Sequence, residues 1–496
     1  MTREPGATVR TTGGRVQGLI EGEFEHWRGI PYASPPVGHR RFRGPSPAEP
    51  WTDVKSAVDF GPGPWQTPLS RSARSFPQGP GVSEDCLTVN VSRRVSRDQG
   101  LPVIVFIYGG GNRSGKSSQY PGERLVGNGE VVAVTFNFRV GVMGFLDVAG
   151  ISGGEEFDSN LALRDQLAAL RWVKDNIAEF GGNPDNVTIY GQSAGALAVT
   201  TLLATPSAEG LFSKAVSASA PAFYVYSRDR VRGWTEDYLA LLGLTSHSDL
   251  SELTRLPAET LVGAAMTFDR RTRRDTAGTI SMSYVVDGDL LPETPISAIR
   301  GGRAHRVPLM IGTCRDEHKL FTKVVKGELA TSTEELEKLF AESPAGALER
   351  VRTAYSTNGR CDGGRVGGDA AFWYPSVAVA EAHSQFAPTR MFRVDRGPRV
   401  FSMLGLGTTH GSDVALIFGQ VDGVDKLLGA ARTDKAIKDT LHADLVAFAR
   451  DGELDEEWPL YEVSGRSTRI YTTERALVSD PESNRRMAWN GFVGYV

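Results

Sequence analysis

The sequence comprises 496 residues, of which 40% are hydrophobic and 23% are charged. This composition is typical of a globular protein and excludes disordered, collagen-like and coiled-coil chains. The 55 basic and 59 acidic residues give a net charge of −4, so the chain has no basic field that would hold a phosphate backbone. Nucleic acid is therefore not an expected partner.

The number of cysteines and the shortness of the apolar segments indicate in which cellular compartment the protein is expected. Cys86, Cys314 and Cys361 make an odd count without a C-x-x-C pair, which predicts neither a zinc site nor a disulfide framework and favours a reducing environment. The N-terminus lacks the apolar segment of a secretion signal, and the apolar run that ends at Tyr108 is far shorter than the ~20 residues that span a bilayer. We expect a cytoplasmic protein that does not enter a membrane.

Short β-branched runs alternate with helical patterns, which is typical of βαβ units and a largely parallel sheet. In chain order, the patterns predict strands at 103–108 and 131–138, a helix at 160–180, a strand at 187–190, a helix at 194–203, helical segments at 229–274, strands at 307–311 and 391–394, and a helix at 439–450. No repeat or linker divides the chain, so we expect one α/β domain over residues 1–496 with helical insertions around 225–300 and 320–385. The charged run 269–274 is interpreted as a solvated face rather than an anion site.

A glycine-flanked serine stands between a predicted strand and a predicted helix. Gly191, Ser193 and Gly195 form the pattern Gly-x-Ser-x-Gly, in which a sharp strand-to-helix turn projects the serine hydroxyl from the carboxyl edge of a sheet. Larger side chains at the two flanking positions would collide with neighbouring backbone. The pattern alone also fits a glycine-bounded turn that holds an ordinary serine, so its context has to decide.

Three consecutive glycines, Gly109, Gly110 and Gly111, follow the apolar strand that ends at Tyr108. Glycines at this place allow backbone N–H groups to approach a substrate oxygen and to stabilise the oxyanion of a tetrahedral intermediate. The alternative is a flexible turn without such a role. Together with the serine turn, the glycine run favours an oxyanion hole.

A serine nucleophile needs a base and an acid that orients the base. Of the eight histidines, His410 is the strongest candidate, because it lies in the small-residue loop 405–411 after a predicted strand. Asp316 and Glu317 follow the strand near Leu309 and give the chain order Ser, acid, His. The sequence pattern does not choose between these two acids.

Further segments resemble the type-B carboxylesterase and cholinesterase family of α/β hydrolases, and the resemblance extends over nearly the whole chain. The matching segments are residues 28–33 with 35–38, 84–87 with 90–91, 137–145, and the block from 160 to 195. The resemblance implies an α/β-hydrolase fold, in which a large, mostly parallel central sheet is flanked by helices and helical insertions form the walls of a gorge.

The resemblance also implies roles for individual residues. Ser193 would be the nucleophile, Glu317 the orienting acid and His410 the base. The backbone N–H groups of Gly110, Gly111 and Ala194 would form the oxyanion hole. Three further polar residues would surround the triad: Gln192, Asp413 and Ser219.

The chain departs from the family pattern near this site. Gln192 and Asp413 stand where the family usually has glutamate, and Asn112 and His318 alter the expected walls of the acyl pocket. Cys86 lacks the cysteine that closes its loop in many secreted members. We therefore expect an intracellular enzyme in which the segment 66–83 opens as a lid over the gorge.

These residues lead to a carboxylic ester hydrolase as the expected function. The serine would attack the ester carbonyl, an acyl-enzyme would form, and water activated by the histidine would release the acid. The substrate would be a small-molecule carboxylic ester, with aryl esters and carbamates within the range of the family, and no cofactor or metal is needed. An acyltransferase that uses the same acyl-enzyme and a non-catalytic binding module of the same fold are the alternatives. The oligomeric state is open and includes a monomer.

Overall fold

The computed structural model describes residues 3–66, 81–96, 98–127, 129–245, 247–420, 431–454 and 456–494. Its strands in these ranges are β1 (Arg3–Arg10), β2 (Arg15–Glu21), β3 (Phe24–Pro31), β4 (Lys55–Ser56), β5 (Gly63–Pro64), β6 (Val82–Ser83), β7 (Thr88–Arg94), β8 (Leu101–Ile107), β9 (Val132–Phe136), β10 (Gly182–Gln192), β11 (Lys214–Ala218), β12 (Tyr226–Ser227), β13 (Val285–Val286), β14 (Leu309–Cys314), β15 (Ser356–Thr357), β16 (Arg360–Cys361), β17 (Thr389–Val394), β18 (Ser467–Tyr471) and β19 (Arg475–Ser479).

The α-helices are α1 (Gly122–Val126), α2 (Val142–Phe145), α3 (Leu161–Asn176), α4 (Ala194–Leu203), α5 (Arg228–Leu241), α6 (Ala258–Asp275), α7 (Pro295–Arg300), α8 (His318–Lys323), α9 (Thr333–Leu339), α10 (Ala347–Ala354), α11 (Gly363–Gly368), α12 (Tyr374–His383), α13 (Arg399–Met403), α14 (Ser412–Ile417), α16 (Ala431–Asp451) and α17 (Ser483–Ala488). A π-helical turn, Asp369–Trp373, joins α11 to α12.

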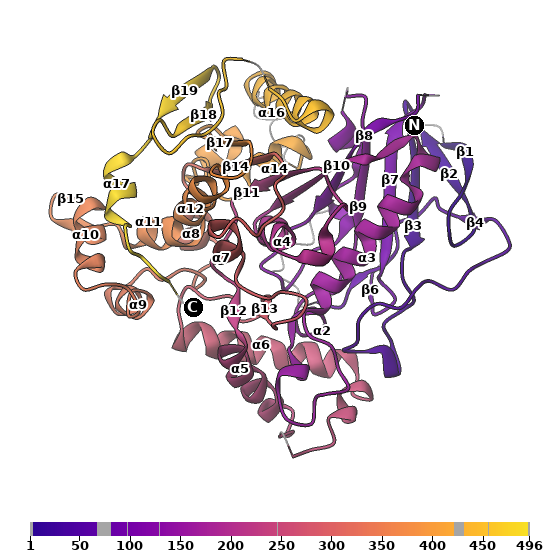
Figure 1. Ribbon diagram of the computed structural model, residues 1–496, viewed down its shortest axis with the longest axis horizontal. Coiled ribbons are helices and arrows are strands. Elements are labelled where there is room, and N and C mark those ends of the chain that lie inside the picture. Colours follow the sequence, from indigo (N-terminus) through magenta and orange to yellow (C-terminus); the bar gives the residue numbers. More distant parts are fainter. Residues whose placement is uncertain are drawn as a thin grey trace.

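One large sheet forms the centre of the molecule (Figure 1). Within the described residues it has 13 strands in the order β1-β2-β3-β7-β9-β8-β10-β11-β14-β17-β18-β19, with β4 paired to β2. Neighbouring strands from β9 to β18 run parallel, whereas the pairs β1–β2, β2–β3, β3–β7, β7–β9 and β18–β19 are antiparallel. The expected large α/β sheet with a parallel centre is confirmed.

The parallel centre forms because its strands are buried along their length. Every residue of β9 and β14 is buried, and in β8 only Leu101 is partly exposed. Strands that are covered on both faces read as continuous apolar runs in the sequence. This burial explains why the runs 103–108 and 131–138 predict strands.

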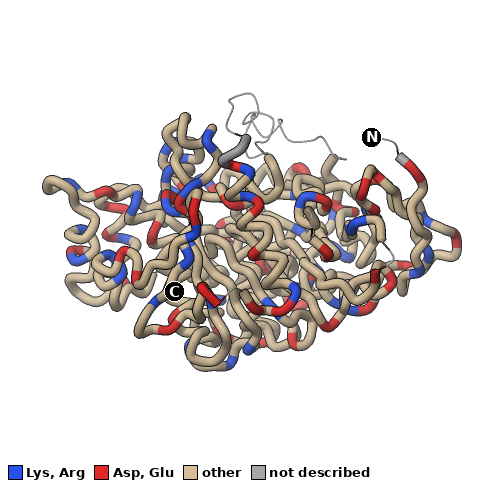
Figure 2. The backbone as a smooth tube through the Cα atoms, turned by 90° about the horizontal axis from the view of Figure 1, so that it is seen from above, with Lys and Arg blue, Asp and Glu red and all other residues tan. Residues whose placement is uncertain are grey.

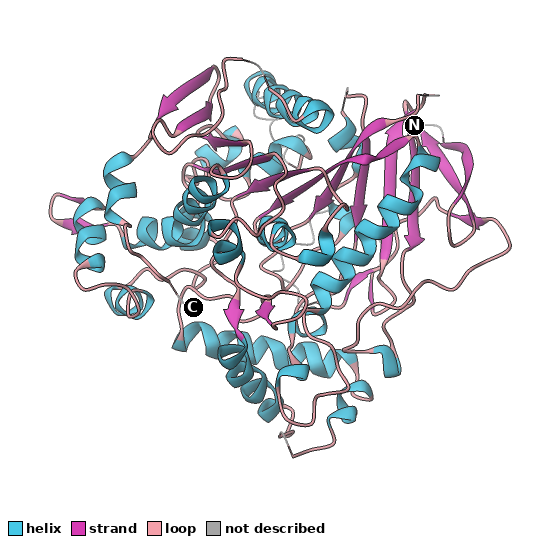
Figure 3. Ribbon diagram, viewed as in Figure 1, coloured by secondary structure: helices cyan, strands magenta, loops and turns pink. Residues whose placement is uncertain are grey.

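Helices pack against this sheet (Figure 3). Helix α4 contacts β8, β10 and β11, α12 contacts β14 and β17, and α16 contacts β8 and β10. In α3, apolar residues at steps of three and four, such as Leu163, Leu167 and Leu170, are buried. The predicted helix 160–180 is confirmed as α3 followed by a 3-10 turn, Ile177–Phe180, and it ends at Gly181, whose φ is 85°.

The predicted helical segments 229–274 form α5 and α6, which lie below the sheet in the view of Figure 1 and pack against each other. A 3-10 turn, Leu250–Thr254, and Pro257 at the N-cap of α6 separate the two helices. Most of α8 and all of α9, α10, α11 and α12 fall within residues 320–385. The late helix begins earlier than expected, at Ala431.

The interpretation of the run 269–274 as a solvated face is wrong for three of its residues, of which Thr272 is buried. The side chains of Asp269 and Arg273 are only 13% and 22% exposed, and both belong to an ion-pair cluster with residues from other segments. The arginines between and after them, Arg270, Arg271 and Arg274, are exposed as expected. The difference arises because only one face of α6 turns toward the protein.

Basic and acidic residues are interspersed over the chain (Figure 2). None of the helices in the described part of the chain combines the length and the apolar character that crossing a membrane requires.

Candidate active site

Ser193 lies at the turn between β10 and α4. Its backbone has φ 59° and ψ −125°, a conformation that persists in an L residue only where the surrounding structure enforces it. A Cβ on Gly191 would lie 2.1 Å from the Gly195 carbonyl oxygen, and a Cβ on Gly195 would lie 2.0 Å from the Ile107 carbonyl oxygen. Backbone contacts therefore require both glycines of the Gly-x-Ser-x-Gly pattern.

Two backbone hydrogen bonds hold this turn at the carboxyl edge of the sheet. The Ser193 N–H donates to the Ala218 carbonyl at the end of β11, and the Ser193 carbonyl accepts from the Leu197 N–H in α4, both at 2.9 Å. The serine thus stands at the N-terminus of a ten-residue helix, where the helix dipole favours negative charge. The strained backbone and the helix N-terminus match the strand-to-helix turn that the Gly-x-Ser-x-Gly pattern predicts.

The structure brings Glu317 and His410 together. His410 Nδ1 lies 2.5 Å from Glu317 Oε2, and their side chains are 6% and 1% exposed. The other carboxylate oxygen, Glu317 Oε1, accepts hydrogen bonds from Ser219 Oγ and from the Cys314 N–H, both at 2.6 Å. Three donors therefore fix the carboxylate in one orientation, and Ser219 is one of them.

Asp316, the other acid that the sequence left open, points elsewhere. Its Oδ2 accepts from the Thr408 N–H at 3.3 Å and pairs with Lys319 at 3.1 Å. Its own N–H donates to the Thr408 carbonyl at 2.9 Å. Asp316 therefore ties the loop of the acid to the loop of the base, and the geometry puts Glu317 against the histidine.

The His410 ring packs against two aromatic rings that stack on each other, and it faces a glutamine. The centroids of Phe372 and Phe321 lie 4.3 Å and 5.1 Å from its centroid. Gln192 Nε2 lies 3.3 Å from His410 Nε2. A neutral imidazole whose Nδ1–H donates to Glu317 would accept a hydrogen bond from this amide at Nε2. The nitrogen that would receive a serine proton is thus the one that Gln192 contacts.

The glycine run passes directly over the serine turn. A Cβ on Gly109 would lie 2.9 Å from Ser193 Cβ, and a Cβ on Gly110 would lie 2.1 Å from the Ser114 carbonyl oxygen. Gly110, Gly111 and Asn112 have φ values of 120°, 61° and 59° in succession. We call residues 109–112 the oxyanion loop. With Ala194 as the first residue of α4, the predicted donors come from this loop and from a helix N-terminus.

Asp413 and Cys314 form a second buried pair beside Glu317. Burial and the nearby charge of Glu317 raise the pKa of Asp413 to about 6. Burial also raises the pKa of the Cys314 thiol, so the thiol stays protonated and can donate to Asp413 Oδ1 at 3.7 Å. Cys314 contacts both carboxyl groups, because its N–H donates to Glu317. The residue pattern did not predict this link, although the place of Cys314 at the end of the strand before the acid is a signal for it.

A pocket of about 250 Å³ opens beside the oxyanion loop, near the lower end of the ~300–1,000 Å³ range of small-molecule sites. Apolar side chains line part of it, including Trp65, Met266 and Met282, and charged side chains line another part. The Asn112 side chain donates to the Met282 carbonyl at 2.9 Å, and the Gly141 N–H donates to the Asn112 carbonyl at 2.6 Å. Two hydrogen bonds thus join the wall of the pocket to the oxyanion loop.

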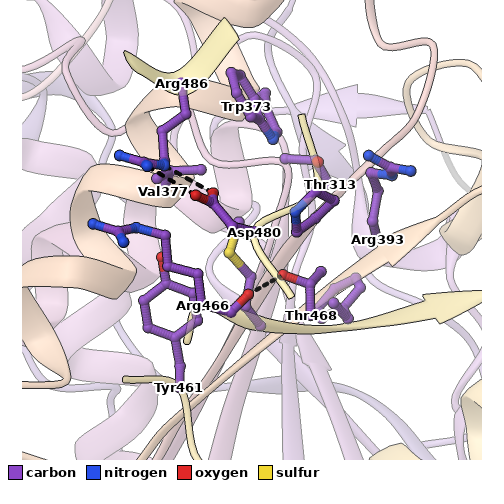
Figure 4. Close-up of a pocket in the computed structure, with 12 residues that line it drawn as sticks. Thr313, Trp373, Val377, Arg393, Tyr461, Arg466, Thr468, Asp480 and Arg486 are labelled. Atoms are coloured by element: carbon purple, nitrogen blue, oxygen red, sulfur yellow. Dashed lines mark hydrogen bonds and ion pairs between the residues drawn. The ribbon is translucent and has the colours of Figure 1, made fainter. Parts of the chain in front are cut away.

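A separate cavity lies where β14, β17 and β18 meet the C-terminal segment (Figure 4). Its volume is about 10 Å³, roughly the space that one water needs. Two of its charged residues, Arg486 and Asp480, pair with each other at 2.8 Å. This cavity has no room for an ester.

Two predictions concern the surroundings of the pocket. His318 is buried at the start of α8 next to the acid, where burial lowers its pKa, and it is not one of the described residues that line the pocket. The predicted lid spans residues 66–83, and residues 67–80 lie outside the described residues. The prediction of an opening lid therefore stays a prediction.

Comparisons with known proteins identify the family to which the chain belongs. The model of the carboxylesterase family matches residues 5–489. Para-nitrobenzyl esterase of Bacillus subtilis (strain 168) is 36% identical over 491 residues, which cover 96% of this chain and 97% of that protein. Phenmedipham hydrolase of Pseudarthrobacter oxydans is 29% identical, with 95% of this chain and 96% of that protein covered.

Solved structures of esterases are also similar to this chain. A PNB esterase superposes with a TM-score of 0.86 at 35% identity, over 97% of this chain and 99% of the other. A carboxylesterase of Geobacillus stearothermophilus superposes with a TM-score of 0.83 at 32% identity, over the same shares. The resemblance found in the sequence is confirmed, and the expected α/β-hydrolase fold with it. This chain belongs to the carboxylesterase family.

Proposed function

We propose that this protein hydrolyses carboxylic esters with Ser193 as the nucleophile, His410 as the base and Glu317 as the orienting acid. The observation that carries the proposal is the 2.5 Å contact between Glu317 and His410, both buried, on loops that follow strands of the same sheet as the strained serine. Membership in the carboxylesterase family supports the reaction class.

The reaction proceeds through an acyl-enzyme. The Ser193 hydroxyl replaces the Gln192 amide as donor to His410 Nε2, transfers its proton there and attacks the ester carbonyl carbon. The N–H groups of Gly110, Gly111 and Ala194 stabilise the oxyanion of the tetrahedral intermediate. The protonated imidazole, held by Glu317, gives its proton to the departing alkoxide. Water, deprotonated by the histidine, then releases the acid.

The substrate is a small carboxylic ester, with aryl esters and carbamates as candidate classes. The pocket beside the oxyanion loop supports an apolar or aryl group, because Trp65, Met266 and Met282 contribute apolar surface to it. Relatives are named para-nitrobenzyl esterase and phenmedipham hydrolase. A para-nitrobenzyl ester and phenmedipham are therefore the first two compounds to test beside a chain-length series of nitrophenyl esters.

Substitution of the nucleophile tests the proposal. Ser193→Ala is expected to abolish nitrophenyl ester hydrolysis, with a loss in kcat on the order of 10⁶, while circular dichroism and Tm stay close to those of the parent protein. A fluorophosphonate probe should label the parent at Ser193 with one equivalent per chain and should not label the variant. Substantial hydrolysis by a folded Ser193→Ala protein would refute the nucleophile assignment.

The fate of the acyl-enzyme distinguishes a hydrolase from the two alternative functions, an acyltransferase and a binding module. For a hydrolase, added alcohols or amines should divert only a minor part of the acyl group away from water, whereas an acyltransferase should transfer most of it to a preferred acceptor. A non-catalytic binding module should show neither labelling by the fluorophosphonate nor formation of an acyl-enzyme. The cytoplasmic location stays a prediction, which fractionation of expressing cells would test.

A further inference from the structure

A charged cluster joins the oxyanion loop to two distant helical segments. It consists of Arg113, Asp269, Arg273 and Glu328, and the side chains are 16%, 13%, 22% and 10% exposed. Arg113 follows the oxyanion loop directly. Asp269 and Arg273 lie on α6, and Glu328 lies between α8 and α9.

Arg113 uses both ends of its guanidinium in this cluster. One terminal nitrogen donates to Asp269 Oδ2 at 2.7 Å, and the other lies 2.8 Å from both Glu328 Oε1 and Glu328 Oε2. Arg273 pairs with the same two carboxylates. Two positive and two negative charges therefore balance within a partly buried cluster, and each carboxylate bridges two arginines.

The cluster acts on a strained segment of backbone. The oxyanion loop has three consecutive residues with positive φ, and one of them is Asn112, which lacks the conformational freedom of glycine. Such backbone persists only where its surroundings hold it. The Arg113 N–H donates to the Gly110 carbonyl at 3.2 Å, and a Cβ on Gly111 would lie 3.1 Å from a guanidinium nitrogen of Arg113. Arg113 thus bonds to Gly110 through its backbone, and its guanidinium lies on the side of Gly111 where a side chain would project.

We propose that Arg113 is a positioning residue that fixes the oxyanion loop by anchoring it to both helical insertions through Asp269 and Glu328. The inference rests on the proposed function, because the oxyanion hole of Gly110 and Gly111 is part of it. Arg113 and the other three cluster residues line the pocket beside the oxyanion loop, and Arg113 acts on the loop rather than on the reacting atoms. It acts by preventing the glycine N–H groups from turning away from the position of the oxyanion.

Arginine is the residue that this role requires. Its planar guanidinium binds two carboxylates at fixed angles, whereas lysine offers a single point charge. Removing Arg113 would leave Asp269 and Glu328 to share Arg273 alone, so the cluster would carry an excess negative charge. Substituting Glu328 at the same time would restore the balance of charge without restoring the anchor.

The test compares Arg113→Gln, Arg113→Lys and the charge-balanced double variant Arg113→Gln/Glu328→Gln with the parent. Arg303→Gln is the matched control, because Arg303 makes a two-nitrogen ion pair with Glu293 on the exposed surface. The measured quantities are kcat and KM for a nitrophenyl ester, and the inhibition constants of a trifluoromethyl ketone and of the matching methyl ketone. The fluorinated ketone forms a tetrahedral adduct with an oxyanion, and the methyl ketone reports binding without that adduct.

We expect Arg113→Gln and the double variant to lose about 10- to 100-fold in kcat, because a small misplacement of a catalytic group has an effect of up to ~10². Affinity for the trifluoromethyl ketone should fall by a similar factor relative to affinity for the methyl ketone, because only the fluorinated ketone forms the oxyanion adduct. Since Arg113 also lines the pocket, KM and the methyl ketone report any separate loss of binding. Arg113→Lys should lie between these variants and the parent. The control should match the parent.

Several results would overturn the proposal. Suppose that the variants fold and that their kcat stays within about twofold of the parent, as does the ratio of the two ketone inhibition constants. Arg113 would then not hold the loop. A change in KM with an unchanged kcat would assign Arg113 to substrate binding instead. If neither glutamine variant folds, the lysine variant decides by the same criteria. A parent protein that the fluorophosphonate does not label at Ser193 would refute the proposed function itself, which is a different outcome from a labelled parent with unaffected variants.

Discussion

Replacing Gln192 by glutamate is expected to shift the pH dependence of catalysis upward. The Gln192 side-chain nitrogen lies 3.3 Å from His410 Nε2, and residue 192 is 7% exposed. At this separation a carboxylate would attract an imidazolium by about 5 kcal/mol at an effective dielectric constant of ~20, which is an upper bound. Desolvation of the new carboxylate and its repulsion by Glu317 reduce this attraction. The apparent pKa of the acidic limb should therefore rise by about one to three units.

The pKa of Asp413 indicates the pH range in which this effect will appear. Its buried carboxyl group has a pKa raised to about 6 beside the same Glu317. A carboxyl group at position 192 meets a similar environment and would be protonated at lower pH, where it no longer attracts the imidazolium. The difference between the two proteins should consequently be largest above about pH 6.

The assay is kcat/KM for a neutral nitrophenyl ester from pH 5 to 9 in the parent, in Gln192→Glu and in Gln192→Met. The methionine variant is the control, because it removes the amide donor and adds no charge. Its acidic limb should move much less than that of the glutamate variant. An acidic limb that stays in place or moves downward in Gln192→Glu would refute the coupling between this residue and the histidine.

Three further predictions concern the acid, its buried neighbour and the lid. Glu317→Gln should lower kcat by several decades and Asp316→Asn by much less, and the reverse order in steady-state kinetics would move the acid to Asp316. Burial raises the pKa of Asp413 in the folded protein to about 6, above the ~3.9 of an unfolded chain. Between these two pH values the native state binds more protons than the unfolded state. The native state therefore loses up to about 3 kcal/mol of stability as the pH rises from ~3.9 through about 6. Asp413→Asn should therefore raise Tm more at pH 8 than at pH 5, and equal differences in calorimetry would contradict this. Hydrogen exchange should be faster across residues 66–83 than across β8, and strong protection there would count against a lid.

Local chemistry in the sequence was enough to predict the serine turn. The strand, the two glycines and the helix around Ser193 are neighbours in the chain, and the glycines are required because backbone atoms lie within 2.1 Å of any added Cβ. Short-range sterics of this kind leave a direct mark on the residue pattern. The composition of its own loop also led to His410 among eight histidines, and the structure places this residue against an acid.

The residue pattern left the two acids open, the family resemblance favoured Glu317, and the tertiary structure places Glu317 against His410. Asp316 and Glu317 are adjacent, carry the same charge and follow the same strand, so no pattern distinguishes them. The turn after β14 directs one carboxylate to His410 and the other to Thr408, and that direction depends on the packing of two loops that are 93 residues apart in the chain.

The ion-pair cluster could not be predicted from the sequence either, because it also depends on the packing of distant segments. Arg113 meets Asp269 and Glu328 across separations of 156 and 215 residues, and each of the three reads in the sequence as an ordinary surface charge. Charged side chains carry no periodic signal of the partner they meet, because pairing depends on the position of whole elements rather than on local spacing. The sequence by itself determined the strand–turn–helix unit and the kind of chemistry, whereas only the folded arrangement decided which charges face the histidine and which ones anchor the oxyanion loop.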